Sequence, residues 1–353
     1  MRKAVFFGMA AALSCAAGCG GGSPTTTSSG GYSATTLHFR ADGTPNLKGL
    51  TLHMGNAAGD ATIGDTVVYM MVQQLKRWGA KADLTNGNAN TTQLAVVSGS
   101  LQATAGPLPA DVDAGLSIFG DNQVHVDYLM VSSTLTSLNQ LKGRTIAIAT
   151  QSSPDNFLLP GALQKAHLAQ SDVKIQYTGS NGNSVNQLAQ GQVDAAFVHA
   201  DGLLTLQQHG TFRVLANSAS LEPWDADSYL TASPAWLKAN PATAEAIDLA
   251  WLHAAHVFDA KKQQWVQSAL AYTKNAVSAS DASAAYDALA KARPWPDDGS
   301  GMDKASLQKN FSAANQSGQI KGQGNRPFSQ WAVTGPWRAA VSYFKAHAAA
   351  IES

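Results

Sequence analysis

The chain has 353 residues, of which 44% are hydrophobic and 14% are charged, and its formal net charge is zero. The 24 basic and 24 acidic side chains form no basic stripe, which excludes nucleic acid as the expected partner. Roughly 320 residues follow the N-terminal segment. That is more than one hydrophobic core usually supports, so we expect two lobes.

The start of the chain has the pattern of an export signal. Two basic residues at 2–3 precede an apolar run at 4–13, which is too short for a membrane-spanning helix of roughly 20 residues. The sequence AAGC at 16–19 resembles the lipobox of bacterial lipoproteins, with alanine in place of the usual leucine. In a lipobox the cysteine is lipidated and becomes the new N-terminus. The resemblance implies a lipid anchor on Cys19; the alternative is plain secretion after cleavage near Ala17.

The segment after the signal predicts a tether. From 20 to 32 the chain consists almost entirely of Gly, Ser, Thr and Pro, which bury little and favour a flexible segment. The chain has two cysteines, Cys15 and Cys19, and both precede this segment. The folded part therefore offers no disulfide framework, no cysteine nucleophile and no cysteine-ligated zinc site.

Strands and helices alternate through most of the remaining chain. A short strand at 50–54 is followed by apolar residues at helical spacing, which predict a helix at 66–78 that ends at Gly79. Further strands are predicted at 82–84, 101–104, 124–131, 145–149, 173–177, 195–198 and 213–216, and further helices at 91–98, 157–167, 184–190 and 202–209. This alternation predicts βαβ units and mostly parallel sheets. After residue 230 the sequence becomes largely helical and Ala-rich.

Three segments resemble one family of binding proteins. Residues 138–149 (LNQLKGRTIAIA) are similar to the "L..LKGK.IA" segment that opens the second lobe of many solute-binding proteins. Residues 187–196 (QLAQGQVDAA) are similar to the "AL..G.VDA" segment of the same group, and 294–320 resembles its C-terminal closing segment. In order and spacing, over about 48–335, the chain resembles the sulfonate/nitrate/taurine and thiamine-precursor branch of the type II periplasmic binding proteins.

The resemblance implies an α/β protein with the two-lobed type II periplasmic binding protein fold. Each lobe is then a mostly parallel sheet flanked by helices, and the ligand lies in the cleft between the lobes. The implied organisation is a lipoprotein signal peptide at 1–19, a flexible tether at 20–45, the first part of lobe 1 at 46–133, lobe 2 at 134–229, and the return of lobe 1 with C-terminal helices at 230–353.

The implied function is solute binding for an ABC importer. The expected partners are a small organic ligand (sulfonate-, taurine- or heterocycle-like), the transporter permease and, through the lipid anchor, the cell membrane. We expect an exported, membrane-anchored monomer without a cofactor or metal, and not an enzyme. Two alternatives share the fold: an enzyme with thiamine-precursor-like chemistry, and a sensor that passes its ligand state to a signalling partner.

Candidate ligand residues in lobe 1 follow two predicted strands. The turn at 55–60 supplies Asn56, Gly59 and Asp60: the glycines allow close backbone approach, the amide can donate and accept hydrogen bonds, and the carboxylate could take an amine. Gly106 and Pro107 follow a short strand and are candidates for the wall of the cleft. An ordinary turn between strand and helix is the alternative for the first group.

The main candidates in lobe 2 lie in the turn at 151–156, which supplies Ser152, Ser153, Asp155 and Asn156. Ser153 as N-cap with proline next would begin a helix, and hydroxyl and N–H groups at a helix start can bind anions. The resemblance implies that serines here reach ligand oxygens. Sulfonate binders often have a histidine where this chain has Asp155, and a carboxylate there argues against a sulfonate.

Three further candidates lie at strand ends or near the return crossing: His199, Asp201 and Trp224. Asp201 could instead be a helix N-cap, and Trp224 could pack in the hinge rather than stack on a planar ligand. Arg144 and Arg213 are the only local arginines, and a strong oxyanion site would usually use one. The aspartates therefore favour a neutral or nitrogen-bearing ligand.

Several catalytic motifs are absent from the sequence: GxxxxGK[ST], HExxH and GxSxG. His253 and His256 could share a helix face, but no acid lies near them at metal-ligand spacing, so packing roles are preferred.

Overall fold

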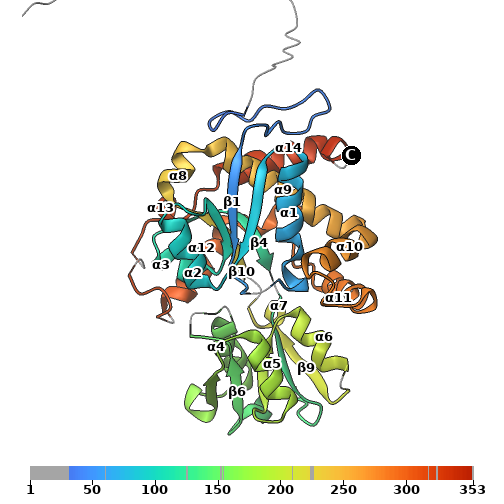
Figure 1. The fold of residues 1–353 in the computed structure, drawn as a ribbon. Coiled ribbons are helices and arrows are strands. Elements are labelled where there is room, and N and C mark those ends of the chain that lie inside the picture. Colours follow the sequence, from blue (N-terminus) through green and yellow to red (C-terminus); the bar gives the residue numbers. More distant parts are fainter. Residues whose placement is uncertain are drawn as a thin grey trace, which may run out of the picture.

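The computed structural model describes residues 32–351 except for 60, 125, 152, 154, 209, 223–225, 317 and 323–324. Within this part the chain forms two five-stranded sheets, each covered by helices, stacked one above the other (Figure 1). We call the upper, larger unit lobe 1 and the lower unit lobe 2. The predicted α/β class with two lobes is confirmed.

Lobe 1 has the strand order β2-β1-β3-β10-β4. Its strands are β1 (Thr51–Asn56), β2 (Lys81–Asn86), β3 (Ala103–Gly106), β4 (Ser117–Val124) and β10 (Ala226–Ala232). Its helices are α1 (Thr66–Arg77), α2 (Ala89–Val97), α3 (Leu108–Asp113), α8 (Pro234–Ala239), α9 (Pro241–Ala260), α10 (Lys262–Tyr272), α11 (Ala279–Ala292), α12 (Lys304–Gln316), α13 (Phe328–Trp331) and α14 (Gly335–Ile351), with 3-10 turns η1 (Ile63–Asp65) and η4 (Ser300–Met302). β1, β2 and β3 run parallel, and β10 lies antiparallel between β3 and β4.

Lobe 2 has the strand order β7-β6-β8-β5-β9. Its strands are β5 (Tyr128–Ser132), β6 (Thr145–Ile148), β7 (Lys174–Tyr177), β8 (Ala195–Val198) and β9 (Phe212–Asn217). Its helices are α4 (Asp155–Ala166), α5 (Asn181–Ala189) and α6 (Ala200–Gln208), with 3-10 turns η2 (Leu138–Leu141) and η3 (Gln170–Asp172), and the short α7 (Ser218–Leu221) leads back towards lobe 1. β6, β7 and β8 run parallel, and β5 is antiparallel to β8 and β9.

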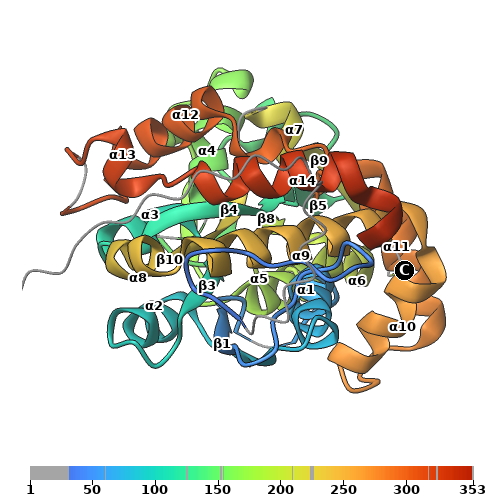
Figure 2. The same cartoon turned by 90° about the horizontal axis from the view of Figure 1, so that it is seen from above.

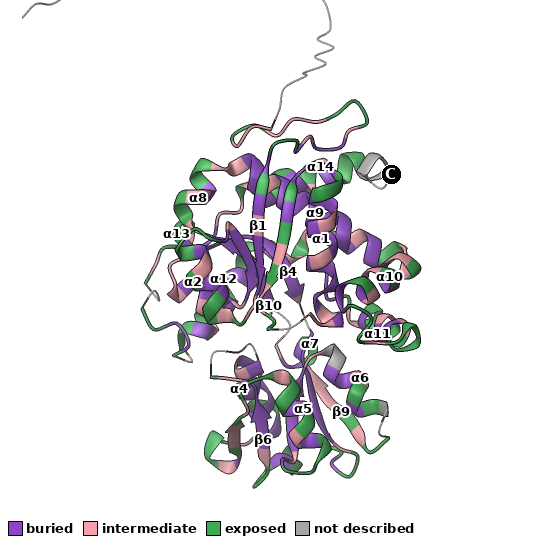
Figure 3. Cartoon of the chain, in the orientation of Figure 1, coloured by how far each residue is buried: buried purple, intermediate pink, exposed green. Residues whose placement is uncertain are grey.

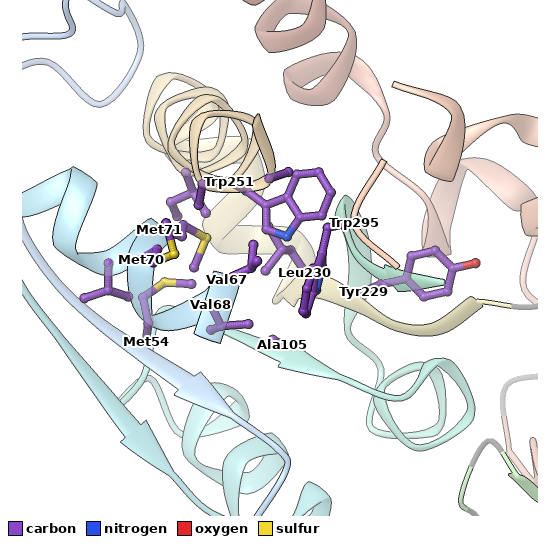
Figure 4. Close-up of a cluster of buried hydrophobic side chains, with 14 of the residues drawn as sticks. Met54, Val67, Val68, Met70, Met71, Ala105, Tyr229, Leu230, Trp251 and Trp295 are labelled. Carbon is purple, nitrogen blue, oxygen red and sulfur yellow. The ribbon is translucent and has the colours of Figure 1, made fainter. Parts of the chain in front are cut away.

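The core of lobe 1 is organised around α9, which packs between α1 and α14 (Figure 2). Fifteen of its 20 residues are buried, and a helix that is apolar on most sides belongs inside a fold. Figure 4 shows Trp251 and Trp295 packed with Leu230 of the sheet and residues of α1. Trp295 also meets Phe258 of α9, with ring centroids 4.7 Å apart. The Ala-rich C-terminal half therefore supplies the helices that cover lobe 1.

Lobe 2 has its own smaller core. Leu129, Ile146, Leu158 and Phe197 are fully buried there, on three strands and α4. Figure 3 shows the same division in both lobes: buried residues fill the sheets and the inner helix faces, and exposed residues lie on outer faces such as that of α11. Each sheet therefore has the covered faces that parallel strands require.

Two segments connect the lobes. One crossing leads from β4 to β5, and the other leads from β9 through α7 to β10. Ser218 N–H donates to the carbonyl of Asp127 at 2.9 Å, which ties the two crossings together. The predicted single strand at 124–131 is therefore wrong: it spans the end of β4, a crossing and most of β5, because no turn residues mark the passage. The sheets likewise assign β5 to lobe 2 and β10 to lobe 1.

The N-terminal part of the described chain packs on the end of lobe 1 that is farthest from lobe 2 (Figure 1). Phe39 stacks on Tyr343 of α14 with ring centroids 4.0 Å apart, and the Tyr343 hydroxyl donates to the Gly43 carbonyl at 2.7 Å. Arg40 donates to the Trp78 carbonyl at 2.5 Å. The described part of the predicted tether at 20–45, from Tyr32 onward, therefore makes contacts with lobe 1. The predicted signal peptide and Cys19 lie outside the described residues.

Candidate functional site

The carboxyl ends of the parallel strands in the two lobes face each other. β1 starts at the outer end of lobe 1 and runs towards lobe 2, and α4 and α6 begin on the side of lobe 2 nearest lobe 1 (Figure 1). α6 contacts α11 and η1 of lobe 1. Open α/β sheets bind ligands outside the carboxyl ends of their strands, so the region between the lobes is the candidate site.

The turn after β6 is held by its own side chains. The Ser153 hydroxyl donates to the Thr150 carbonyl at 2.7 Å and accepts from the Thr150 N–H at 3.0 Å. Asn156 Nδ2 donates to the Gln151 carbonyl at 3.0 Å. The helix begins at Asp155, two residues after the predicted N-cap, and Ser152 lies outside the described residues. Ser153 and Asn156 thus shape the loop that faces lobe 1.

Three polar residues lie close together behind this turn: Asp155 at the start of α4, His199 after β8, and Asp127 in the first crossing. The Asp155 carboxyl is fully buried and accepts from the Ala149 N–H at 3.0 Å. His199 Nε2 lies 3.2 Å from Oδ1 of Asp127, which is also fully buried, while the His199 side chain keeps 31% of its exposure. Burial raises the pKa of Asp155, against the lowering effects of the Ser153 hydroxyl and of His199. The imidazole is therefore the accessible member of a buried acidic cluster.

In lobe 1, Asn56 lies at the end of β1 and is only 2% exposed. Its amide donates to the Tyr272 hydroxyl at 3.1 Å, which in turn donates to Asn86 Oδ1 at 2.7 Å. Burial raises the pKa of Tyr272, so the phenol stays protonated and can donate. Asn56 thus joins the ends of β1 and β2 to α10. Gly59 follows with φ +89°, a conformation that favours glycine, and Asp60 lies outside the described residues.

Gly106 and Pro107 end β3 and lead into α3. A Cβ on Gly106 would lie 2.8 Å from Oδ2 of Asp111, so the glycine leaves room for that buried carboxyl. Thr231 donates to the same oxygen at 2.7 Å. Burial raises the pKa of Asp111 to about 7. The contact that requires a glycine here is therefore with the protein's own α3.

The remaining sequence-based candidates are Asp201, Trp224 and the two arginines of lobe 2. Asp201 lies inside α6, one residue beyond its start, and not at the N-cap position. Trp224 lies outside the described residues. Both arginines lie at the strand ends of lobe 2 that are farther from lobe 1. Arg144 precedes β6 and pairs with Asp194 at 3.0 Å, and Arg213 lies opposite Val131, near the end of β5. Neither reaches the strand ends that face lobe 1.

Two residues with buried polar contacts escaped the sequence-based prediction. Asp127 interrupts an otherwise apolar run, and a carboxylate inside a buried strand is a usable signal, because such groups need partners. Tyr272 gave no local signal, since its partner Asn56 is 216 residues away in sequence. Among the described residues, no cluster of three or more His, Cys, Asp or Glu is arranged to hold a metal ion. That part of the chain also contains no helix with the length and hydropathy needed to cross a bilayer.

Comparisons with known proteins agree with this architecture. Residues 128–229 match the family model of the ABC transporter phosphonate periplasmic substrate-binding protein. A sulfonate ABC transporter periplasmic sulfonate-binding protein, SsuA of Methylobacillus flagellatus, has a similar structure with a TM-score of 0.66 and 19% identity, covering 85% of this chain and 96% of its own. SsuA of Escherichia coli has a TM-score of 0.65 and 17% identity, with 80% and 91% coverage.

Two further solved structures mark the breadth of this fold. The periplasmic nitrate-binding protein NrtA of Synechocystis has a TM-score of 0.64 and 11% identity, with 86% and 91% coverage. The desulfurization enzyme DSZB has a TM-score of 0.58 and 14% identity, with 83% and 99% coverage. No protein with a curated function matches the chain by sequence. The chain therefore has the type II periplasmic binding protein fold expected from its motifs, and its lobe 2 matches the phosphonate-binding family of ABC transporter substrate-binding proteins.

Proposed function

We propose that this protein is the solute-binding component of an ABC importer, which captures a small organic molecule between its lobes and delivers it to a permease. The observation that carries the proposal is the family match across lobe 2, combined with facing strand ends and two crossings that can act as hinges. Export by the N-terminal signal, lipidation at Cys19 and a monomeric state belong to the same proposal.

The charge distribution at the strand ends favours a ligand with a hydrogen-bond-donating nitrogen over a bare anion. The buried acidic side chains of Asp127 and Asp155 lie near His199, and the residue at the start of α4 is thus an acid that offers a bare anion no positive charge. Arg144 and Arg213 of lobe 2 lie at the strand ends that are farther from lobe 1. A zwitterion of the taurine type or a neutral heterocycle fits this chemistry.

An enzymatic role has less support. A desulfurization enzyme shares the fold, but the cysteines of this chain are confined to positions 15 and 19, so no thiol nucleophile is available between the lobes. A sensor would use the same ligand site and would differ only in its partner, a signalling protein instead of a permease.

A thermal-shift screen of the chain from Tyr32 onward tests the proposal. The panel contains sulfonates, taurine, nitrate, carboxylates, amines and pyrimidines. A ligand at 100 times its Kd stabilises the native state by about 2.7 kcal/mol, which gives a clear rise in Tm. We expect a hit among zwitterions or heterocycles that is lost in His199→Ala and kept in Lys238→Ala, a substitution in α8 of lobe 1. If only bare anions raise the Tm, the expected class of zwitterions or heterocycles is contradicted. If no compound raises the Tm, the proposed role in solute transport loses its support.

A further inference from the structure

Lobe 1 contains a cavity away from the strand ends described above. Its volume is about 540 Å³, within the range of roughly 300–1,000 Å³ of small-molecule sites. It is lined by residues of α1 and α10, two helices that contact each other, and α9 contributes His253. Most of the side chains that line it are polar: Tyr69, Gln73, Gln74, Lys76, Arg77, His253, Gln264, Gln267 and Ser268.

The lining of this cavity is positive. Lys76 and Arg77 come from the last turn of α1, and no acidic side chain belongs to the described lining. Within the described chain, neither cation forms an ion pair, and the recorded bond of Arg77 is a donation to Gln74 Oε1 at 3.2 Å. Cations at a helix C-terminus are common, but here they line a cavity that is also lined by four glutamine side chains. The guanidinium and the ammonium therefore have donors to offer an occupant.

The strongest indication of a ligand is His253. The residue is only 5% exposed and lines the cavity, and the structure records no hydrogen bond for either of its ring nitrogens. Burial lowers the pKa of His253 to about 4, with Arg77 and Lys261 adding to the effect, so the ring is neutral at pH 7. The ring nitrogens are not among the buried side-chain atoms that lack a partner, so they remain open to the cavity, where an occupant can replace water as their partner.

We propose that this cavity is a second binding site, which accepts a small molecule carrying a carboxylate or phosphate group. The anionic group pairs with Arg77 and Lys76, the neutral imidazole donates its N–H to an anionic oxygen, and the glutamine amides bind the polar remainder. This site is independent of the ligand site between the lobes, because all its lining residues belong to lobe 1.

Citrate and inorganic phosphate serve as probes, and the imidazole signals of His253 in heteronuclear NMR report occupancy at this site. We expect saturable shifts of the His253 signals and a rise in its pKa when the anion offsets the charge of Arg77. Arg77→Gln removes an exposed lining donor and should weaken binding about tenfold or more. Lys261→Gln is the matched control, because it removes a nearby charge that does not line the cavity.

Three outcomes would overturn the proposal. The first is an absence of His253 shifts with either probe at millimolar concentration. The second is unchanged binding in Arg77→Gln, and the third is an equal loss in Lys261→Gln, which would reduce the effect to the general positive field of the region. None of these results bears on ligand binding between the lobes, which is tested separately by the thermal-shift screen with His199→Ala.

Discussion

The buried carboxyl of Asp111 makes a sharp prediction about stability and pH. Burial raises its pKa from 3.8 to about 7 in the folded state. Because the folded pKa lies above the unfolded one, the contribution of this group to stability is fully present below about pH 4 and is lost as the pH rises through 7. At 1.36 kcal/mol per pH unit, full ionisation costs roughly 4 kcal/mol.

Asp111→Asn removes the charge and keeps an oxygen that can accept from the Thr231 hydroxyl, now 2.7 Å away. The new amide N–H group meets the Gln93 side chain, which bonds the Asp111 carboxyl and has to turn its oxygen to accept, so we expect a cost of about 1 kcal/mol at every pH. We therefore expect the variant to be slightly less stable than the wild type at pH 4 and roughly 2–3 kcal/mol more stable at pH 8.

Urea denaturation at pH 4, 5, 6, 7 and 8, followed by tryptophan fluorescence, measures this crossover. Asp287→Asn is the matched control, because its carboxylate is exposed and pairs with Lys262 on the surface, where ion pairs contribute under about 1 kcal/mol. If Asp111→Asn and the wild type lose stability in parallel between pH 4 and pH 8, the reasoning from burial is refuted.

Three further substitutions, one of them with a matched control, test the packing. Gly301→Ala places a Cβ 1.7 Å from Oδ2 of buried Asp121 and should lower the free energy of unfolding by about 1–3 kcal/mol, whereas Gly335→Ala meets no neighbour and should change little. Trp295→Ala should cost about 3–5 kcal/mol by opening the aromatic cluster; a cost below 1 kcal/mol in urea melts would contradict that packing. Tyr272→Phe leaves Asn56 and Asn86 without their shared hydroxyl and should cost about 1–3 kcal/mol, with unchanged stability as the contrary result.

The elements that the sequence predicts best are those with a strong local pattern. The helix at Thr66–Arg77 lies within one residue of its predicted end, because apolar residues recur on one face and Gly79 follows with φ +104°. β8 coincides with the apolar run at 195–198. β4 and β10 were not predicted as strands, because their place in the sheet depends on pairing with residues far away in the sequence.

The sequence predicted where the candidate residues lie along the strands better than it predicted what their side chains contact. Strand-end residues such as Asn56 and Gly106 do lie at strand ends, because the βαβ pattern fixes where strands stop. Their contacts are with Tyr272 and Asp111, and only the tertiary fold brings those partners within reach. Side-chain direction and distant partners cannot be derived from local patterns, so the ligand role of these residues remains a prediction.

The attachment of the N-terminal segment determines which half of the molecule a membrane anchor would restrain. Tyr32 bonds to Thr243 of α9, and Phe39 and Arg40 hold the following residues on the outer end of lobe 1. A linker joined at Tyr32 would therefore restrain only lobe 1. Lobe 2 is connected through the two crossings, at the end of lobe 1 opposite to this attachment (Figure 1). If Cys19 carries the proposed lipid anchor, rotation of lobe 2 does no mechanical work against it, and the proposed solute binding should have the same affinity in the membrane-bound and the released protein.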